Sequence, residues 1–134
     1  MIKTVAVGTD GSDTAARAVS EALELAERFG ARLVVLSAFD GRPGASSGEW
    51  RSNAAEQAER VLADVEEAAA ERGIECRSAM EEGDPGEVLV SLAERHGADI
   101  LVVGNKGMER RVLGSVPNTV THKASCSVLV VKTA

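Results

Sequence analysis

The stretch that decides the fold reads Asp99-Ile-Leu-Val-Val-Gly-Asn-Lys-Gly-Met-Glu-Arg-Arg-Val-Leu-Gly-Ser-Val-Pro-Asn118. It begins with the unbroken apolar run Ile100 to Val103. A run of this length and composition is typical of a strand that is buried on both faces of a parallel sheet. We expect the strand to stop at Gly104, because glycine interrupts strands and favours turns.

The residues after this strand have the composition of a phosphate-binding loop. Glycines at 104 and 107 let backbone N–H groups approach an anion, and Gly114-Ser115 opens a predicted helix whose first N–H groups lack partners within the helix. The pattern is not a Walker A motif, since no Gly-Lys-Ser/Thr follows four residues after a glycine. Three cations in the loop can pair with phosphates or merely solvate an exposed turn: Lys106, Arg110 and Arg111.

Outward from this stretch, apolar runs alternate with segments of helical periodicity along the whole chain. Such alternation with short links predicts right-handed crossovers and one parallel sheet with helices on both faces. The segment 74–80 alternates between apolar and polar residues, which suits an edge strand. The expected strands are 2–8, 32–38, 74–80, 100–103 and 127–132, and the expected helices are about 13–29, 49–72, 85–96 and 116–123.

The first strand ends in the turn Thr9-Asp10-Gly11-Ser12. Ser12 is expected to cap the following helix, which leaves Asp10 to face the crevice beyond the strand ends. Ligands of parallel sheets bind where the winding of the strands reverses. If the first and fourth strands are neighbours there, Asp10 and the Gly104 loop converge on one crevice. A phosphorylated-aspartate site is disfavoured, because Val7-Gly8-Thr9 adds no further carboxylate for Mg²⁺.

Composition excludes several function classes. The 134 residues suffice for one domain (1–134), and the net charge of −6 with 2% aromatic residues disfavours nucleic acid or an anionic membrane as a partner. No apolar run has the length of a membrane span, and a strand is expected directly after Met1, so we expect no signal peptide and a cytoplasmic protein. The segment 40–48, rich in turn-forming residues, is expected to be a surface loop.

The reactive side chains do not form a catalytic or metal-binding pattern. His96 and His122 are far apart in sequence and have no cysteine cluster beside them, so we expect no zinc site and assign no catalytic residue. Cys76 and Cys126 lie in strand-like apolar surroundings, where small buried hydrophobic residues are expected rather than a redox pair.

Taken together, these motifs closely resemble those of the universal stress protein (UspA) family. The resemblance covers essentially all 134 residues and is carried by four segments: Val7-Gly-Thr-Asp-Gly-Ser12, Gly83-Asp-Pro85, Ala98-Asp-Ile-Leu-Val-Val-Gly104 and Ser125-Cys-Ser-Val-Leu-Val-Val131. It implies an α/β three-layer sandwich of the adenine nucleotide alpha-hydrolase-like type, whose five parallel strands are ordered 3-2-1-4-5. It also implies a homodimer paired through the last strand, around Val128 to Val131.

The resemblance further implies an adenine-nucleotide site. In ATP-binding members, the aspartate matching Asp10 holds the ribose and the backbone matching Ala38 meets the adenine. The loop glycines and the Gly-Ser pair carry ribose and phosphates, and Mg²⁺ can accompany ATP. The sequence Gly-Ser-Val-Pro is similar to the corresponding segment in a branch of the family that includes cyclic-AMP binders. The candidate nucleotide-binding residues are Gly8, Thr9, Asp10, Ala38, Val103, Gly104, Asn105, Gly107, Gly114, Ser115 and Val116.

The chain departs from the family pattern at two points. Six residues, Met108 to Leu113, separate the second and third motif glycines, where the family has nine. Pro117 also stands where many ATP-binding members carry Ser or Thr, and proline supplies neither a hydroxyl nor an N–H. Both changes weaken the expected contacts to a triphosphate more than those to adenosine.

The prediction is therefore a dimeric module that binds ATP, AMP or cyclic AMP at the carboxyl ends of the first and fourth strands. One alternative is a dimeric interaction protein of the same fold that acts without nucleotide. A second alternative is an enzyme that hydrolyses ATP slowly at most.

Overall fold

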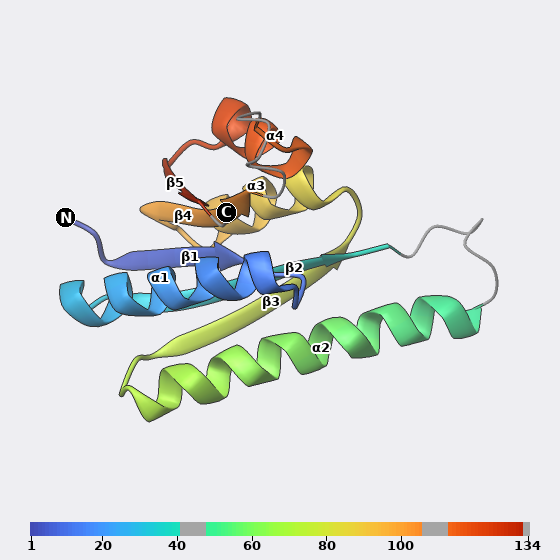
Figure 1. Cartoon of the computed structure of the whole chain (residues 1–134), viewed down its shortest axis with the longest axis horizontal. Helices are drawn as coiled ribbons and strands as arrows, with labels where there is room; N and C mark the ends of the chain where they lie inside the picture. Colours follow the sequence, from blue (N-terminus) through green and yellow to red (C-terminus); the bar gives the residue numbers. More distant parts are fainter. Residues whose placement is uncertain (41–47, 106–112, 133–134) are drawn as a thin grey trace.

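The structure is a computed structural model, which describes residues 1–40, 48–105 and 113–132. The central part of the predicted 40–48 loop and the segment with Lys106, Gly107, Arg110 and Arg111 lie outside these residues. Strands and helices alternate along the chain (Figure 1). The elements are β1 (Thr4–Gly8), α1 (Asp13–Phe29), β2 (Arg32–Phe39), α2 (Gly48–Glu71), β3 (Cys76–Glu82), α3 (Pro85–Arg95), β4 (Ile100–Asn105), α4 (Ser115–Lys123) and β5 (Ser127–Lys132).

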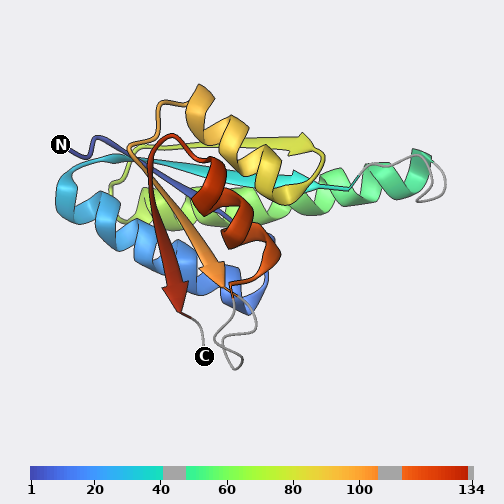
Figure 2. The same ribbon diagram turned by 90° about the horizontal axis from the view of Figure 1, so that it is seen from above.

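The five strands form one parallel sheet in the order β3-β2-β1-β4-β5, which confirms the predicted topology. Val5 of β1 is in register with Leu33 of β2 on one side and with Ile100 of β4 on the other. The arrows of β4 and β5 point to the same end of the molecule in Figure 2. The winding reverses between β1 and β4, so the carboxyl ends of these two strands border the crevice that this topology creates.

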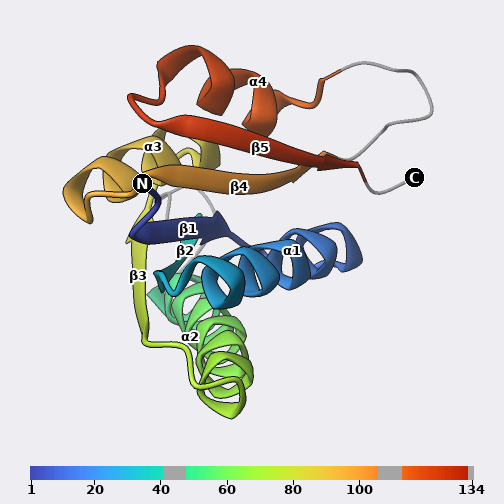
Figure 3. The ribbon, with the colours of Figure 1, turned by 90° about the vertical axis from the view of Figure 1, so that its left-hand side faces the viewer.

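Two hydrophobic cores lie on opposite faces of the sheet. Figure 3 shows α1 and α2 over one face and α3 and α4 over the other. Alternate residues of the same strand supply the two cores: Val5 and Val7 pack on the α1–α2 side, whereas Ala6 packs on the α3–α4 side. This alternation explains why the central strands are continuous apolar runs, since neither of their faces meets water.

The helix ends follow the sequence signals. The Ser12 hydroxyl oxygen accepts a hydrogen bond from the Ala15 N–H at 3.2 Å and caps α1. Gly30 ends α1 with a φ of 63°, a left-handed conformation that glycine adopts without a steric penalty. The predicted caps at both ends of this helix are confirmed.

The predicted end of the fourth strand was wrong. β4 continues through Gly104 and Asn105, which are in register with Val131 and Lys132 of β5. The neighbouring strand supplies ladder hydrogen bonds that offset the conformational freedom lost by glycine in a strand. Gly104 is therefore part of the sheet, and β4 ends at Asn105, two residues beyond Val103.

The two cysteines are free thiols and are partly rather than fully buried, which corrects the expectation of buried side chains. Cys76 packs against the core on the α1–α2 side, and Cys126 packs against the core on the α3–α4 side, so the sheet separates the two thiols. Burial raises the pKa of Cys76 to about 11, and it also raises the pKa of Cys126. Neither cysteine has the lowered pKa of a reactive thiol.

Among the described residues, no helix has the length and apolar content needed to cross a bilayer.

Candidate functional site

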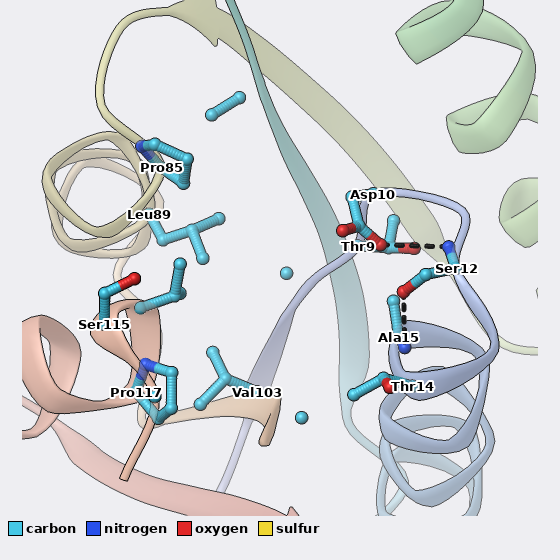
Figure 4. A pocket seen from close by; sticks show the side chains of 15 residues that line it. Thr9, Asp10, Ser12, Thr14, Ala15, Pro85, Leu89, Val103, Ser115 and Pro117 are labelled. Carbon is cyan, nitrogen blue, oxygen red and sulfur yellow. Dashed lines mark hydrogen bonds between the residues drawn. The ribbon is translucent and has the colours of Figure 1, made fainter. Parts of the chain in front are cut away.

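A cavity of about 300 Å³ opens at the carboxyl ends of β1 and β4 (Figure 4). A parallel sheet whose strand order reverses at this point is expected to bind its ligand here. The volume lies at the lower end of the range for small-molecule sites. The cavity is lined by Gly8, Thr9, Asp10, Ser12, Thr14, Ala15, Ala38, Pro85, Leu89, Val103, Gly104, Gly114, Ser115, Val116 and Pro117.

The wall next to α1 is polar and is built by the turn after β1. The Asp10 carboxylate accepts a hydrogen bond from the Ser12 N–H at 2.9 Å, and the Thr9 hydroxyl oxygen accepts one from the Gly11 N–H at 3.1 Å. Ser12 was expected to organise the start of α1 without Asp10, whereas the Asp10 carboxylate also takes part through this bond. Asp10 organises the start of α1 and is also exposed to the cavity. These bonds hold its carboxylate in a defined place, because the turn that carries it is itself hydrogen-bonded.

The opposite wall comes from α3 and α4 and is mostly apolar, with the Ser115 hydroxyl as its polar group. Figure 4 shows Pro85 and Leu89 of α3 on the same side of the cavity as Pro117 of α4, facing Asp10 and Thr14 across it. Such a division into a polar and an apolar wall suits a ligand that has a flat apolar part and hydroxyl groups.

Two contacts fix α3 relative to α4. An ion pair joins Glu87 of α3 to Lys123 of α4, and the pKa of Lys123 is raised because it donates to Glu87. Gly86 lets the two helices approach closely, since a Cβ added there would lie 2.7 Å from Thr119.

The two strand glycines that line the cavity are needed for helix packing. A Cβ built on Gly8 would lie 2.6 Å from a terminal methyl of Leu89 on α3. A Cβ built on Gly104 would lie 2.8 Å from the Thr14 methyl and 2.9 Å from the Thr14 carbonyl oxygen on α1. Glycine at both positions thus allows one helix to approach from each face of the sheet. The sequence explained Gly104 by the approach of an anion, and in the structure the residue lines the cavity and also leaves room for α1.

The first turn of α4 borders the cavity. Gly114 is its N-cap residue and makes no side-chain capping bond, while the caps of α1 and α3 use the side chains of Ser12 and Asp84. Helical geometry leaves the N–H groups of Ser115 and Val116 without acceptors inside the helix, and Pro117 has no N–H. The helix dipole adds partial positive charge at this end, which favours an anion.

The structure brings together most of the predicted site residues and leaves out two. Asn105 is buried beneath the cavity and does not line it, and Gly107 lies outside the described residues. Whether the assembled residues bind nucleotide stays a prediction. Those that share the cavity are Gly8, Thr9, Asp10, Ala38, Val103, Gly104, Gly114, Ser115 and Val116.

Several lining residues were not predicted, and most of them are apolar or small. Pro85 belongs to the Gly83-Asp-Pro85 segment of the resemblance, but neither Pro85 nor Leu89 was assigned to the site, because their place in the cavity depends on how α3 lies on the sheet. Pro117 was expected only as a departure from the family pattern, and here it forms part of the apolar wall. The unpredicted residues are Ser12, Thr14, Ala15, Pro85, Leu89 and Pro117.

Asp10 is the one ionisable side chain among the described residues that line the cavity. The described part of the chain also contains no group of three or more His, Cys, Asp or Glu side chains that could hold a metal ion. This arrangement can bind a ligand through hydroxyls, backbone N–H groups and one carboxylate. It does not place an acid and a base on either side of a reacting bond.

Comparison with known proteins agrees with this architecture. The profile of the Universal stress protein family matches residues 1–132. A universal stress protein of Mycobacterium tuberculosis is 38% identical over 98% of this chain and 97% of its own length. One from Methanocaldococcus jannaschii is 36% identical over 98% of this chain and 83% of its length.

Solved structures share the fold along the whole chain. A universal stress protein crystallised in complex with cAMP is 33% identical, with a TM-score of 0.80 and coverage of 99% of both chains. The universal stress protein from Archaeoglobus fulgidus in complex with dAMP is 25% identical, with a TM-score of 0.75 and coverage of 97% of this chain and 98% of its own. From its sequence, its strand order and these likenesses, the chain belongs to the universal stress protein family.

Proposed function

We propose that this protein is a dimeric regulatory module that binds an adenine nucleotide in the cavity at the carboxyl ends of β1 and β4. The observation that carries the proposal is the cavity of about 300 Å³. The Asp10 turn lies on one side of this cavity and the first turn of α4 lies on the other. Two relatives of the same fold were solved with cAMP and with dAMP, which supports an adenine nucleotide as the ligand class.

The two walls suit different parts of such a ligand. Leu89, Val103 and Pro117 offer an apolar surface, while the Asp10 carboxylate can accept hydrogen bonds from ribose hydroxyls. A phosphate would lie against Ser115, whose hydroxyl and N–H are donors at the start of α4.

These donors suit one phosphate better than three. Pro117 removes one N–H from the first turn, and Asp10 is the one charged side chain among the described lining residues. We therefore propose that AMP and cyclic AMP bind at least as tightly as ATP, which would need Mg²⁺ to offset its charge. Hydrolysis of ATP is slow or absent in this proposal.

The proposal is tested by calorimetric titration of the whole protein with adenosine, AMP, cyclic AMP and ATP with Mg²⁺. Asp10→Asn retains an oxygen that accepts from the Ser12 N–H, so the turn persists while the charge is lost. The loss of a charge-assisted bond to the ribose is expected to weaken binding by about tenfold or more. The matched control is Asp64→Asn, which makes the same chemical change at an exposed position of α2 and should leave the affinity unchanged.

A ligand that binds the folded state also raises the melting temperature by mass action, which gives an independent readout. Flat titrations with all four ligands would contradict the proposal. They would favour instead a dimeric interaction protein of the same fold that works without nucleotide.

A further inference from the structure

Asn105 is a buried polar residue at the end of β4. It is only 2% exposed, and its backbone is paired in the sheet opposite Lys132. A buried amide side chain needs hydrogen-bond partners, because leaving its polar atoms unsatisfied costs stability. Its side-chain oxygen accepts a hydrogen bond from the Gly114 N–H at 2.8 Å, across nine residues of sequence.

Gly114 is in turn the residue on which α4 begins. Its carbonyl oxygen accepts from the Asn118 N–H at 2.9 Å, which closes the first turn of the helix. The residues that follow, Ser115 and Val116, line the cavity. The Asn105 side chain therefore joins the rigid sheet to the part of α4 that faces the ligand.

Val116 packs against the core on the α3–α4 side and Pro117 is buried, and further contacts hold α4 farther along the helix. Thr119 packs against Gly86, Val120 is fully buried in the core, and Lys123 pairs with Glu87. Loss of the Asn105 bond would leave these contacts intact and would release the Gly114 N–H from the sheet, at the point where α4 begins and borders the cavity.

We infer that Asn105 is a positioning residue of the nucleotide site, which holds the first turn of α4 in the place where Ser115 and Val116 can meet the ligand. The inference rests on the proposed function. Asn105 does not line the cavity, so its effect on affinity acts through Gly114. Without the bond, binding must also order the first turn, and that cost lowers affinity.

The test combines calorimetry with hydrogen exchange at the Gly114 amide, measured on the whole ¹⁵N-labelled protein. Asn105→Ala is expected to weaken adenosine and AMP binding by about fivefold, the size set by one hydrogen bond, and to speed Gly114 exchange by a similar factor. Asn105→Asp keeps an oxygen that can accept from the Gly114 N–H, so it should retain more Gly114 protection and more affinity for uncharged adenosine than Asn105→Ala does. Asn118→Ala is the matched control, since Asn118 is exposed on the same helix and does not line the cavity.

The inference is overturned if Asn105→Ala retains its affinity, or if Asn105→Asp loses as much affinity for adenosine as Asn105→Ala does. Should Asn105→Ala fail to fold, the wild-type protein decides the matter. Saturation with AMP should then slow exchange of the Gly114 amide, and an unchanged rate would refute the inference. If wild-type protein binds none of the ligands, the proposed function fails, and the inference fails with it. A failure at Asn105 alone leaves the proposed function standing.

Discussion

At the scale of the residue, a single carboxylate secures the sheet at the end opposite the cavity. One side-chain oxygen of Asp99 accepts hydrogen bonds from the Lys3 N–H at 2.8 Å and from the Thr4 N–H at 2.9 Å. Arg32 closes the same end, since its guanidinium donates to the Thr4 hydroxyl and to the His96 carbonyl oxygen. Asp99 begins the stretch that decides the fold, yet its role became visible only when β4 was placed beside β1.

These backbone bonds lower the pKa of Asp99 below the ordinary value of 3.8. A carboxyl group whose pKa is lower in the folded state stabilises that state above its unfolded pKa, and the contribution is lost as the pH falls through the folded pKa. We therefore expect part of the acid sensitivity of folding, below a pH of about 4, to come from Asp99.

Urea unfolding at neutral and acidic pH tests this expectation. Asp99→Asn keeps an acceptor but cannot titrate, so its free energy of unfolding should fall less steeply with acid than that of the wild type. Asp64→Asn, at an exposed position of α2, should keep the wild-type slope. Parallel pH profiles for Asp99→Asn and the wild type would show that the carboxylate does not contribute.

At the scale of the element, two glycines in the strands leave room for helices to pack closely against the sheet. Gly8 leaves room for α3 and Gly104 leaves room for α1, and the two positions differ in what an added methyl group would meet. Next to Gly8 are the terminal methyl groups of Leu89, which can rotate away. Next to Gly104 is the backbone carbonyl of Thr14, which cannot move without the helix.

Gly104→Ala is therefore expected to destabilise the protein by about 1–3 kcal/mol, the usual cost of overpacking. Gly8→Ala should cost less, because the Leu89 side chain can adopt another rotamer and make room for the methyl group. In both variants, alanine loses less backbone entropy on folding than glycine does. Chemical denaturation of the two variants measures the difference. A larger loss for Gly8→Ala than for Gly104→Ala would contradict this view of the two contacts.

At the scale of the whole molecule, the two edges of the sheet differ in chemistry. The β3 edge carries Arg77, Glu81 and Glu82, and charged residues of this kind discourage pairing with another sheet. The β5 edge presents Val128, Leu129 and Val130, which are only partly buried in the single chain. This difference supports a homodimer that forms through β5.

Sedimentation equilibrium tests the dimer. We expect the wild type to associate and Val128→Lys to shift the equilibrium strongly toward monomer, because a charge would enter the apolar contact between the two chains. Ala79→Lys places the same charge at a half-buried position of β3 and should leave the dimer intact. A monomeric wild type, or an equal effect of both variants, would contradict the assignment of this edge.

The amino-acid sequence is sufficient to predict the alternation of strands and helices, the caps of α1 and the membership of the family. These features depend on local periodicity, on the backbone preferences of single residues and on chain-long motifs, all of which can be read without knowing which elements touch. The strand order, which followed from the family resemblance, was confirmed as well.

The end of β4, the packing of Gly104 against α1 and the set of residues that complete the cavity depend on the tertiary structure. β4 continues through Asn105 because β5 lies alongside it, and Asp10 faces Pro85 and Leu89 because α3 crosses the sheet at that point. The Asn105 side chain likewise meets Gly114, which lies nine residues farther along the chain, only in the folded structure. Such contacts depend on distances between elements far apart in the chain, and local sequence patterns do not encode those distances.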